Sequence, residues 1–204
     1  TKDIRLNLGS NINGIDLFEQ NIFNNNLFGL SGIELPQFNF ISLNDGFSLS
    51  MELNNKINFS FGLVEDTSKK KLNSDNTLHQ TFLNYKPNNK SQLKFGYGIV
   101  NEVNSILQTE KKGAFGSTRK NKSNFITVGG KYLFSKKWNI FGSYSEIHSN
   151  SPKNSGFFSN WSNINSNSFT MGIGNTEIFM SNDNLTFSVY QPMRVYKSKV
   201  DITE

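Results

Sequence analysis

The sequence of 204 residues contains no cysteine, four prolines, two tryptophans and two histidines. The lack of cysteine excludes disulfide frameworks and thiolate metal sites. No apolar run is long enough to cross a bilayer as a helix, and hydrophobic residues make up only 35% of the chain, so a helical membrane protein is excluded too. The chain starts at Thr1 with no signal-like segment before it, so we expect a mature product or a fragment.

The sequence also has little that indicates catalysis. Neither His79 nor His148 lies in a motif of the serine-hydrolase kind, and no cluster of residues has metal-ligand spacing. The Gly-X-Gly pairs at 96–98 and 172–174 fall within strand-like stretches, so they are not dinucleotide-binding loops. We therefore predict no catalytic, cofactor or metal site in this segment, and we predict that it is not an enzyme.

The sequence does contain many aromatic residues and a regular alternation of apolar with polar or small residues. Aromatics reach 13%, with 19 Phe, and they recur in short runs in which apolar residues alternate with polar or small ones. That period of two is typical of strands with two unlike faces. About ten strands are expected, which predicts an antiparallel all-β chain with a single domain over 1–204. The clearest segments are 47–53, 56–65, 92–101, 123–134, 138–145, 165–175 and 185–195, whereas the alternation is weaker in 77–86 and mixed in 33–42.

The lengths of the connections predict how these strands are arranged. From residue 47 onward short and long connections alternate, so an up-and-down sheet would have all short turns at one end and all long loops at the other. This asymmetry is typical of outer-membrane barrels. The first part, 1–32, is expected to be irregular or differently paired, because 10–32 is long where a short turn is needed and Asn44–Gly46 resembles a tight turn.

Two-faced strands fit either a soluble protein or a membrane barrel. A soluble sandwich buries the apolar face, whereas a membrane barrel turns it toward lipid. Strand lengths, polar faces rich in Gly, Ser, Thr and Asn, and aromatics near strand ends (Tyr85, Tyr97, Phe134, Trp138, Tyr144) favour an antiparallel up-and-down outer-membrane-type β-barrel, incomplete as given. The candidate lipid-facing residues are Phe59, Phe61, Phe95, Tyr97, Val128, Tyr132, Ile140, Met171, Phe187 and Val189.

A proline-containing motif near the end of the chain carries a family resemblance. Residues 185–195 read LTFSVYQPMRV, with Gln191, Pro192 and Arg194 after an apolar strand and with Asp183 in the preceding turn. The stretch resembles the C-terminal barrel region of subtilisin-like (subtilase) autotransporter serine proteases of Gram-negative bacteria. The resemblance covers roughly 92–195. Further matching residues are Gly96–Gly98, Ile106–Leu107, Gly113–Gly116, Trp161, Ser168–Phe169, Phe179 and Val195.

This resemblance implies an outer-membrane segment that translocates or anchors a covalently linked passenger, which in that family is a serine protease. Met193 departs from the family's usual Leu, and the chain reaches Glu204 without a terminal aromatic strand, so we expect closing strands to be missing. The alternatives left open are a soluble β-sandwich or barrel that acts as a binding module, and a free-standing porin-like barrel.

Net charge is +5, and the lysines concentrate at 69–71 and 111–122. The first interpretation is charge on solvated loops. Nucleic acid is not expected, because the aromatic residues alternate with Ser and Gly rather than with Lys and Arg. A second hypothesis is that Lys111, Lys112, Arg119, Lys120 and Lys122 contact lipopolysaccharide phosphates.

Overall fold

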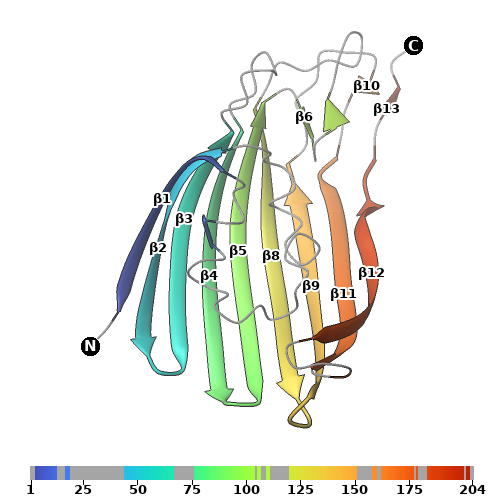
Figure 1. Cartoon of the computed structure of the whole chain (residues 1–204). Coiled ribbons are helices and arrows are strands. Elements are labelled where there is room, and N and C mark those ends of the chain that lie inside the picture. The colour runs from blue at the N-terminus through green and yellow to red at the C-terminus, as the bar shows by residue number, and fades with distance from the viewer. Residues whose placement is uncertain are drawn as a thin grey trace.

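The computed structural model describes residues 3–12, 17–18, 44–66, 76–103, 105–106, 109–110, 120–150, 158–159, 162–176, 178, 183–199 and 201–202. Nine strands form one antiparallel sheet in the order β1-β2-β3-β4-β5-β8-β9-β11-β12 (Figure 1). Their bounds are β1 Ile4–Ile12, β2 Asn44–Asn54, β3 Ile57–Asp66, β4 Thr77–Asn88, β5 Ser91–Val103, β8 Lys120–Leu133, β9 Trp138–Ser149, β11 Ile164–Thr176 and β12 Asn184–Lys197. The prediction of an all-β, antiparallel, up-and-down chain is therefore confirmed.

Four very short strands make two small pairs near the long connections. β6 (Ser105–Ile106) pairs with β7 (Thr109–Glu110), and β10 (Phe158–Ser159) pairs with β13 (Asp201–Ile202). Both pairs are antiparallel and neither joins the nine-stranded sheet. The main sheet therefore defines the two faces of the molecule.

Side chains next to the backbone fix the short turns at one end of the sheet. Between β2 and β3, Asn54 Oδ1 accepts hydrogen bonds from the backbone N–H groups of Lys56 and Ile57, at 2.8 and 2.9 Å. Asn88 makes the same two bonds, at the same distances, in the turn between β4 and β5. Asparagine favours turns because its side chain replaces a backbone acceptor in this way. The abundance of Asn thus has a direct structural use here.

The strand ends that are joined by the longer connections all lie at the opposite end of the sheet, as the spacing predicts (Figure 1). The expectation for the N-terminal part needs a correction. Residues 44–46 begin β2 and pair with both β1 and β3, so they are not a turn. The connection between β1 and β2 is therefore the single long segment 13–43, and the alternation of long and short connections holds from the first strand. The mixed segment 33–42 falls outside the described residues.

Pro192 lies in an edge strand at a break in the pairing. Phe169 of β11 is opposite Gln191, but two residues further along, Asn167 is opposite Arg194, so β12 contains one extra residue between these pairs. A proline lacks the N–H that a regular ladder needs, and edge strands and bulges are where it is tolerated. Pro192 therefore occupies the kind of position its chemistry requires.

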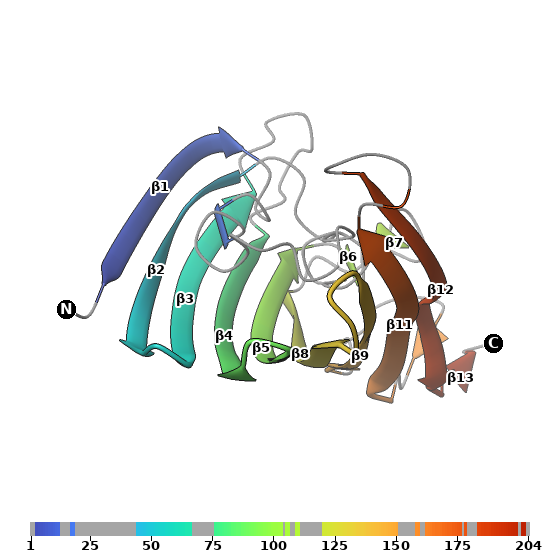
Figure 2. The same ribbon diagram turned by 60° about the horizontal axis from the view of Figure 1, so that its bottom comes forward.

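The sheet curls into an arc, as the view from the short-turn end shows (Figure 2). Within the described residues β1 and β12 are its edge strands, each hydrogen-bonded to one neighbour in the sheet. Strand twist produces this curvature, and an arc of this kind has a concave inner face and a convex outer face. The two faces differ sharply in composition, and that difference defines the candidate site.

Candidate functional site

The outer face carries apolar side chains along entire hydrogen-bonding rows of the sheet. One row of paired residues, followed from β1 to β11, reads Ile4, Met51, Phe59, Leu83, Phe95, Val128, Tyr144 and Phe169. Its last member, Gln191 on β12, is the first that is neither apolar nor aromatic. Many of these side chains are open to the surroundings: Ile4 is 63% exposed and Phe95 is 45% exposed. An exposed apolar surface of this extent is unusual for a soluble monomer.

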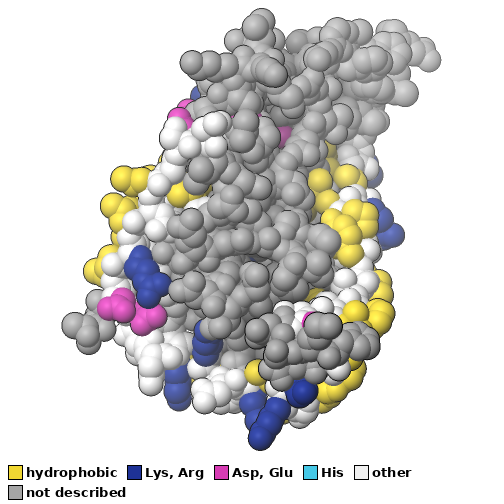
Figure 3. Space-filling view, in the orientation of Figure 1, with side chains coloured by type: hydrophobic (Ala, Val, Ile, Leu, Met, Phe, Trp, Pro, Cys, Tyr) yellow, Lys and Arg dark blue, Asp and Glu magenta, His cyan; other side chains and the backbone are white. Residues whose placement is uncertain are grey.

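All ten side chains predicted to face lipid lie on this outer face. Eight of them are classed as exposed: Phe95, Tyr97, Val128, Tyr132, Ile140, Met171, Phe187 and Val189, the last two being the most open at 65% and 64%. Phe59 and Phe61 are half-buried. Figure 3 shows hydrophobic side chains along both flanks of the arc. These ten residues therefore share one face of the sheet, and the contact of that face with lipid stays a prediction.

The apolar band crosses the sheet diagonally with respect to the hydrogen-bonding rows. A row closer to the long loops starts with Leu8, Phe47 and Leu63 but ends with His148, Asn165 and Lys197. On the last strands the apolar residues shift toward the short turns, where Ile140, Ile173 and Phe187 form one row. Strands that are tilted relative to a level apolar layer produce this displacement, since the rows run perpendicular to the strands.

Aromatic side chains lie at the limits of this band. Toward the short turns Phe134 and Trp138 stack with ring centroids 6.5 Å apart. Toward the long loops the hydroxyl of Tyr97 donates to Asn124 at 3.4 Å and that of Tyr144 donates to Glu146 at 3.3 Å. Tyr and Trp have an apolar ring and a polar group, so they are enriched where an apolar layer meets water.

Polar groups replace the apolar band at the long-loop end of β9, β11 and β12. The Glu146 carboxylate accepts a hydrogen bond from the Tyr196 hydroxyl at 2.5 Å, and this bond raises the pKa of Tyr196 above its usual 10.0. His148 Nδ1 is 3.0 Å from Asn165 Oδ1, and its Nε2 is 3.8 Å from Glu146. Tyr196 and His148 are exposed, and Glu146 and Asn165 are half-buried, so these polar groups form a hydrogen-bonded border to the apolar band.

The inner face has the opposite character, because its polar side chains are buried. Ser123 and Ser149 share a hydrogen bond of 2.7 Å, and Thr127 and Ser145 share one of 2.9 Å. Asn139 Nδ2 donates to the carbonyl of Gly174 at 3.2 Å. Hydroxyl and amide groups satisfy one another across the strands, which lowers the cost of removing them from water. The predicted assignment of Gly, Ser, Thr and Asn to the inner side therefore matches these positions.

Sequence reasoning missed a set of large apolar side chains on the inner face. Phe82, Phe125 and Phe141 point inward and are nearly or completely buried. Each fits beside small residues: a Cβ at Gly172 would lie 2.5 Å from Phe141 Cζ, and one at Gly96 would lie 2.9 Å from Phe82 Cε1. Each inner Phe is paired with an inner Gly on a neighbouring strand. The sequence contains this match between large and small residues, but it can be recognised only when the register is known.

Leu17 and Phe18 fill the inner face on the β1–β4 side of the arc. Both are buried, and the Leu17 carbonyl accepts hydrogen bonds from Ser48 Oγ at 2.6 Å and from Asn7 Nδ2 at 3.1 Å. The Phe18 ring packs edge-on against Phe82 with centroids 5.8 Å apart. It also occupies the space above Gly62, where a Cβ would lie 2.5 Å from the ring. The inner face is thus packed with side chains here.

Lys94 is the one lysine of the inner face that is almost completely buried, at 2% exposure, among the described residues. Its ammonium group lies 4.7 Å from the centroid of the Phe82 ring, a geometry suited to a cation–π interaction. Lys131 lies on the same face and is half-buried. Inner lysines are therefore concentrated on β4, β5 and β8 toward the short turns.

The residues of the family motif lie together on β12. Gln191 Nε2 donates to Asn167 Oδ1 at 2.9 Å, immediately before the bulge at Pro192, and Arg194 resumes the pairing opposite Asn167. Asp183 caps the start of the same strand by accepting the N–H of Ile178 at 2.7 Å. Phe179, Trp161 and residues 113–116 of the motif lie outside the described residues.

The described part of the chain contains no group of three or more His, Cys, Asp or Glu side chains able to hold a metal ion. His79 and His148 are on different strands, and both face outward. No helix within the described ranges is long and apolar enough to span a membrane. Comparison with family models, with curated proteins and with solved structures gave no match.

Proposed function

We propose that the sheet forms the wall of an outer-membrane-type β-barrel, with its outer face against lipid acyl chains. The observation that carries the proposal is the inversion of the two faces: apolar rows are exposed on the outer side, whereas hydroxyl and amide groups are buried on the inner side. A soluble sandwich gains its stability by burying the apolar face, so it would show the reverse arrangement.

The limits of the apolar band support the same proposal. The band runs diagonally across the rows, as a level bilayer would require of tilted strands. Tyr97 and Tyr144 direct their hydroxyls toward the polar groups at one border, and Trp138 lies at the other. The proposal includes partners for β1 and β12, either each other or further strands, because unpaired backbone groups are costly in lipid.

The role that we propose for the barrel is to anchor or translocate an exported passenger at the bacterial outer membrane. The resemblance to the subtilase autotransporters is the reason for this choice. A free-standing porin is less well supported, because inner aromatic rings such as Phe82, Phe125 and Phe141 fill space that a wide aqueous channel would need. Lys120 and Lys122 are exposed beyond the apolar band at the long-loop end, where contacts with lipopolysaccharide phosphates would be made.

Fluorescence quenching in lipid vesicles tests the membrane proposal. The chain would carry Trp161→Phe, so that Trp138 is the remaining tryptophan, and it would be reconstituted with lipids brominated at different acyl-chain depths. We expect Trp138 to be quenched most by shallow bromines, and a Trp in place of Phe95 (with Trp138→Phe) to be quenched most by deep ones. A chain that stays in the aqueous phase, with Trp138 quenched by iodide and not by bromines, would refute the proposal.

The translocator role needs a separate test in cells. A small folded reporter would be fused upstream of Thr1 in a chain supplied with an export signal, and exposure of the reporter would be measured by adding protease to intact cells. We expect the reporter to be cleaved only when the barrel segment is present. Reporter retained inside the cell, with the barrel correctly inserted, would argue for a free-standing barrel.

A further inference from the structure

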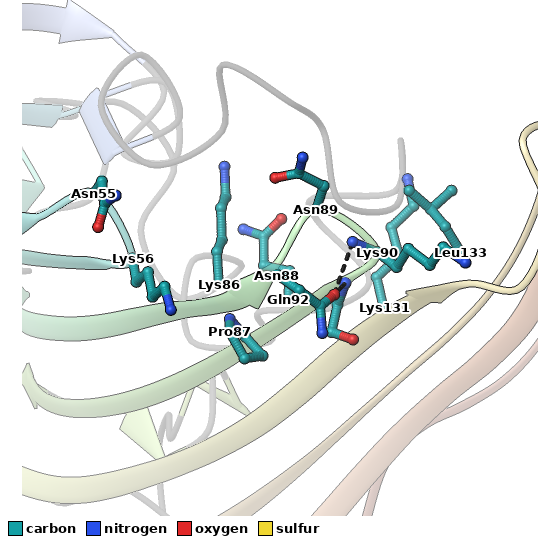
Figure 4. Close-up of a pocket in the computed structure, with 11 residues that line it drawn as sticks. Asn55, Lys56, Lys86, Pro87, Asn88, Asn89, Lys90, Gln92, Lys131 and Leu133 are labelled. Carbon is teal, nitrogen blue, oxygen red and sulfur yellow. Dashed lines mark hydrogen bonds between the residues drawn. The ribbon is translucent and has the colours of Figure 1, made fainter.

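A groove with a volume of about 530 Å³ opens on the inner side of the sheet at the short-turn end. Four lysines line it: Lys56 and Lys86 from the region of the first two short turns, Lys90 from the turn between β4 and β5, and Lys131 from β8 (Figure 4). We call this feature the lysine mouth. Its volume lies within the range that ligand pockets occupy in proteins.

The lysine mouth is strongly and uniformly positive. Among the described residues no carboxylate lines the groove, and the ammonium groups of Lys56, Lys86 and Lys90 have neither an ion-pair nor a hydrogen-bond partner. The lysine ammonium groups repel one another at close range. Binding of an anion between them would therefore be favourable. Lysine and arginine side chains also gather at this end in the space-filling view (Figure 3).

A buried polar group lies close to the groove but is not among the residues that line it. Asn84 lies two residues from Lys86 on the same face of β4, is 3% exposed, and has no hydrogen-bond partner for either polar atom of its side chain. Buried amides without partners are rare, because each unmade hydrogen bond costs free energy.

The types of side chain in the mouth indicate the kind of anion. Arginine, whose planar group suits bidentate phosphate recognition, is absent from the lining, whereas lysine acts as a flexible point charge. Asn88, Asn89 and Gln92 add side-chain amides that match the hydrogen bonding of a peptide backbone. We propose that the lysine mouth binds an extended polypeptide segment rich in Asp and Glu.

This inference goes beyond the proposed function and does not depend on it. An acidic segment would bind to the inner side of the short-turn end whether the outer face meets lipid or another protein. If the barrel translocates a passenger, the mouth is the place where an extended chain on the short-turn side would first meet the inner face. Failure in the bromine experiment would therefore leave the peptide-binding experiment fully interpretable.

The test measures binding of fluorescent peptides to the full chain in a non-ionic detergent. A Glu-rich peptide, a Lys-rich peptide and a Ser/Asn peptide of equal length would be compared by anisotropy, with inorganic polyphosphate as a competitor. We expect only the Glu-rich peptide to bind, and its affinity to fall as salt concentration rises. Polyphosphate binding with no measurable binding of the Glu-rich peptide would overturn the proposal.

Two variants with the same change in net charge distinguish the mouth from charge in general. K56Q/K86Q/K90Q removes three lysines of the mouth, and K120Q/K122Q/K197Q removes three exposed lysines at the long-loop end. For exposed ion pairs of ordinary strength, the first variant should weaken peptide binding about tenfold and the second less than twofold. Equal losses in the two variants, with unchanged circular dichroism, would overturn the proposal.

Discussion

The outer and inner faces of this sheet use side chains in two different ways. Outside, one kind of residue is repeated: apolar side chains follow each other across the rows, and their individual shapes matter little to the protein itself. Inside, large and small residues are matched pair by pair, as where the Phe141 ring lies above Gly172. The outer face therefore repeats one chemical character, whereas the inner face is built as a close-packed interior.

The difference in packing predicts a difference in tolerance to substitution. An outer apolar residue should be replaceable by any other apolar residue, and only a charge should be costly. On the inner face even one additional methyl group should be costly where a ring occupies the space above a glycine. The predictions below test this contrast, and they are arranged from the largest expected effect to the smallest.

Introducing a charge in the middle of the outer face should have the largest effect. Phe95→Arg should lower the free energy of unfolding in lipid vesicles by about 2–4 kcal/mol, because the charge would lie at the centre of the apolar layer. Asn124→Arg is the matched control: Asn124 also faces outward, but it lies at the polar border beside His148. Its cost should be about 0–1 kcal/mol. Equal costs for the two variants would contradict a lipid-facing band.

Adding volume at an inner glycine should come next. In Gly172→Val the new Cβ would meet Phe141 Cζ and the carbonyl oxygen of Phe187, both at 2.5 Å, so a loss of about 1–3 kcal/mol is expected from overpacking. Gly142→Val is the control, since Gly142 faces outward on the adjoining strand and its nearest contact would be at 3.4 Å. Denaturant unfolding measures both. A greater loss at Gly142 than at Gly172 would reverse the contrast between the faces.

These two faces also differ in how far the sequence predicts them. Alternation predicted the outward direction of residues such as Phe95, Met171 and Phe187, because a period of two is a local property of each strand. It could not predict that Phe82, Phe125 and Phe141 point inward to fill the interior, since an inner Phe is placed by a glycine on another strand. That information lies in the register, which is a long-range property.

The N-terminal part shows a second limit of sequence reasoning. Asn44–Gly46 has the composition of a tight hairpin turn, yet these residues lie within the ladder between β1 and β3. The pairing of Gly46 with both neighbouring strands outweighs its local preference, and Leu17 Cδ1 would lie 3.2 Å from a Cβ at this position. Tertiary packing therefore determined the conformation at a position where local propensity indicated a turn.

The lysine mouth was also missed by the sequence analysis, because its residues come from strands and turns that are far apart in the sequence.

Removing one inner hydroxyl should have a moderate effect that a second substitution partly reverses. Ser123→Ala leaves the buried Ser149 hydroxyl without its 2.7 Å partner, which should cost about 1–3 kcal/mol. S123A/S149A removes both groups and should be more stable than the sum of the single variants predicts. A double-mutant cycle of denaturant unfolding measures this coupling. Strictly additive losses would show that the two hydroxyls do not interact.

The smallest expected effect is a local dependence on pH at the edge strand β1. The Asp45 carboxylate accepts hydrogen bonds from Ser10 Oγ at 2.7 Å and from the Asn11 N–H at 3.0 Å, and these bonds lower the pKa of Asp45 below its usual 3.8. A lowered carboxyl pKa means that the stabilisation is fully present above the ordinary pKa and is lost as the pH falls through the lowered value. Amide hydrogen exchange at Asn11, corrected for its intrinsic pH dependence, should therefore accelerate below about pH 4. Asp45→Asn cannot lose a proton and should abolish this acceleration, whereas an acceleration that persists in Asp45→Asn would place the titrating group elsewhere.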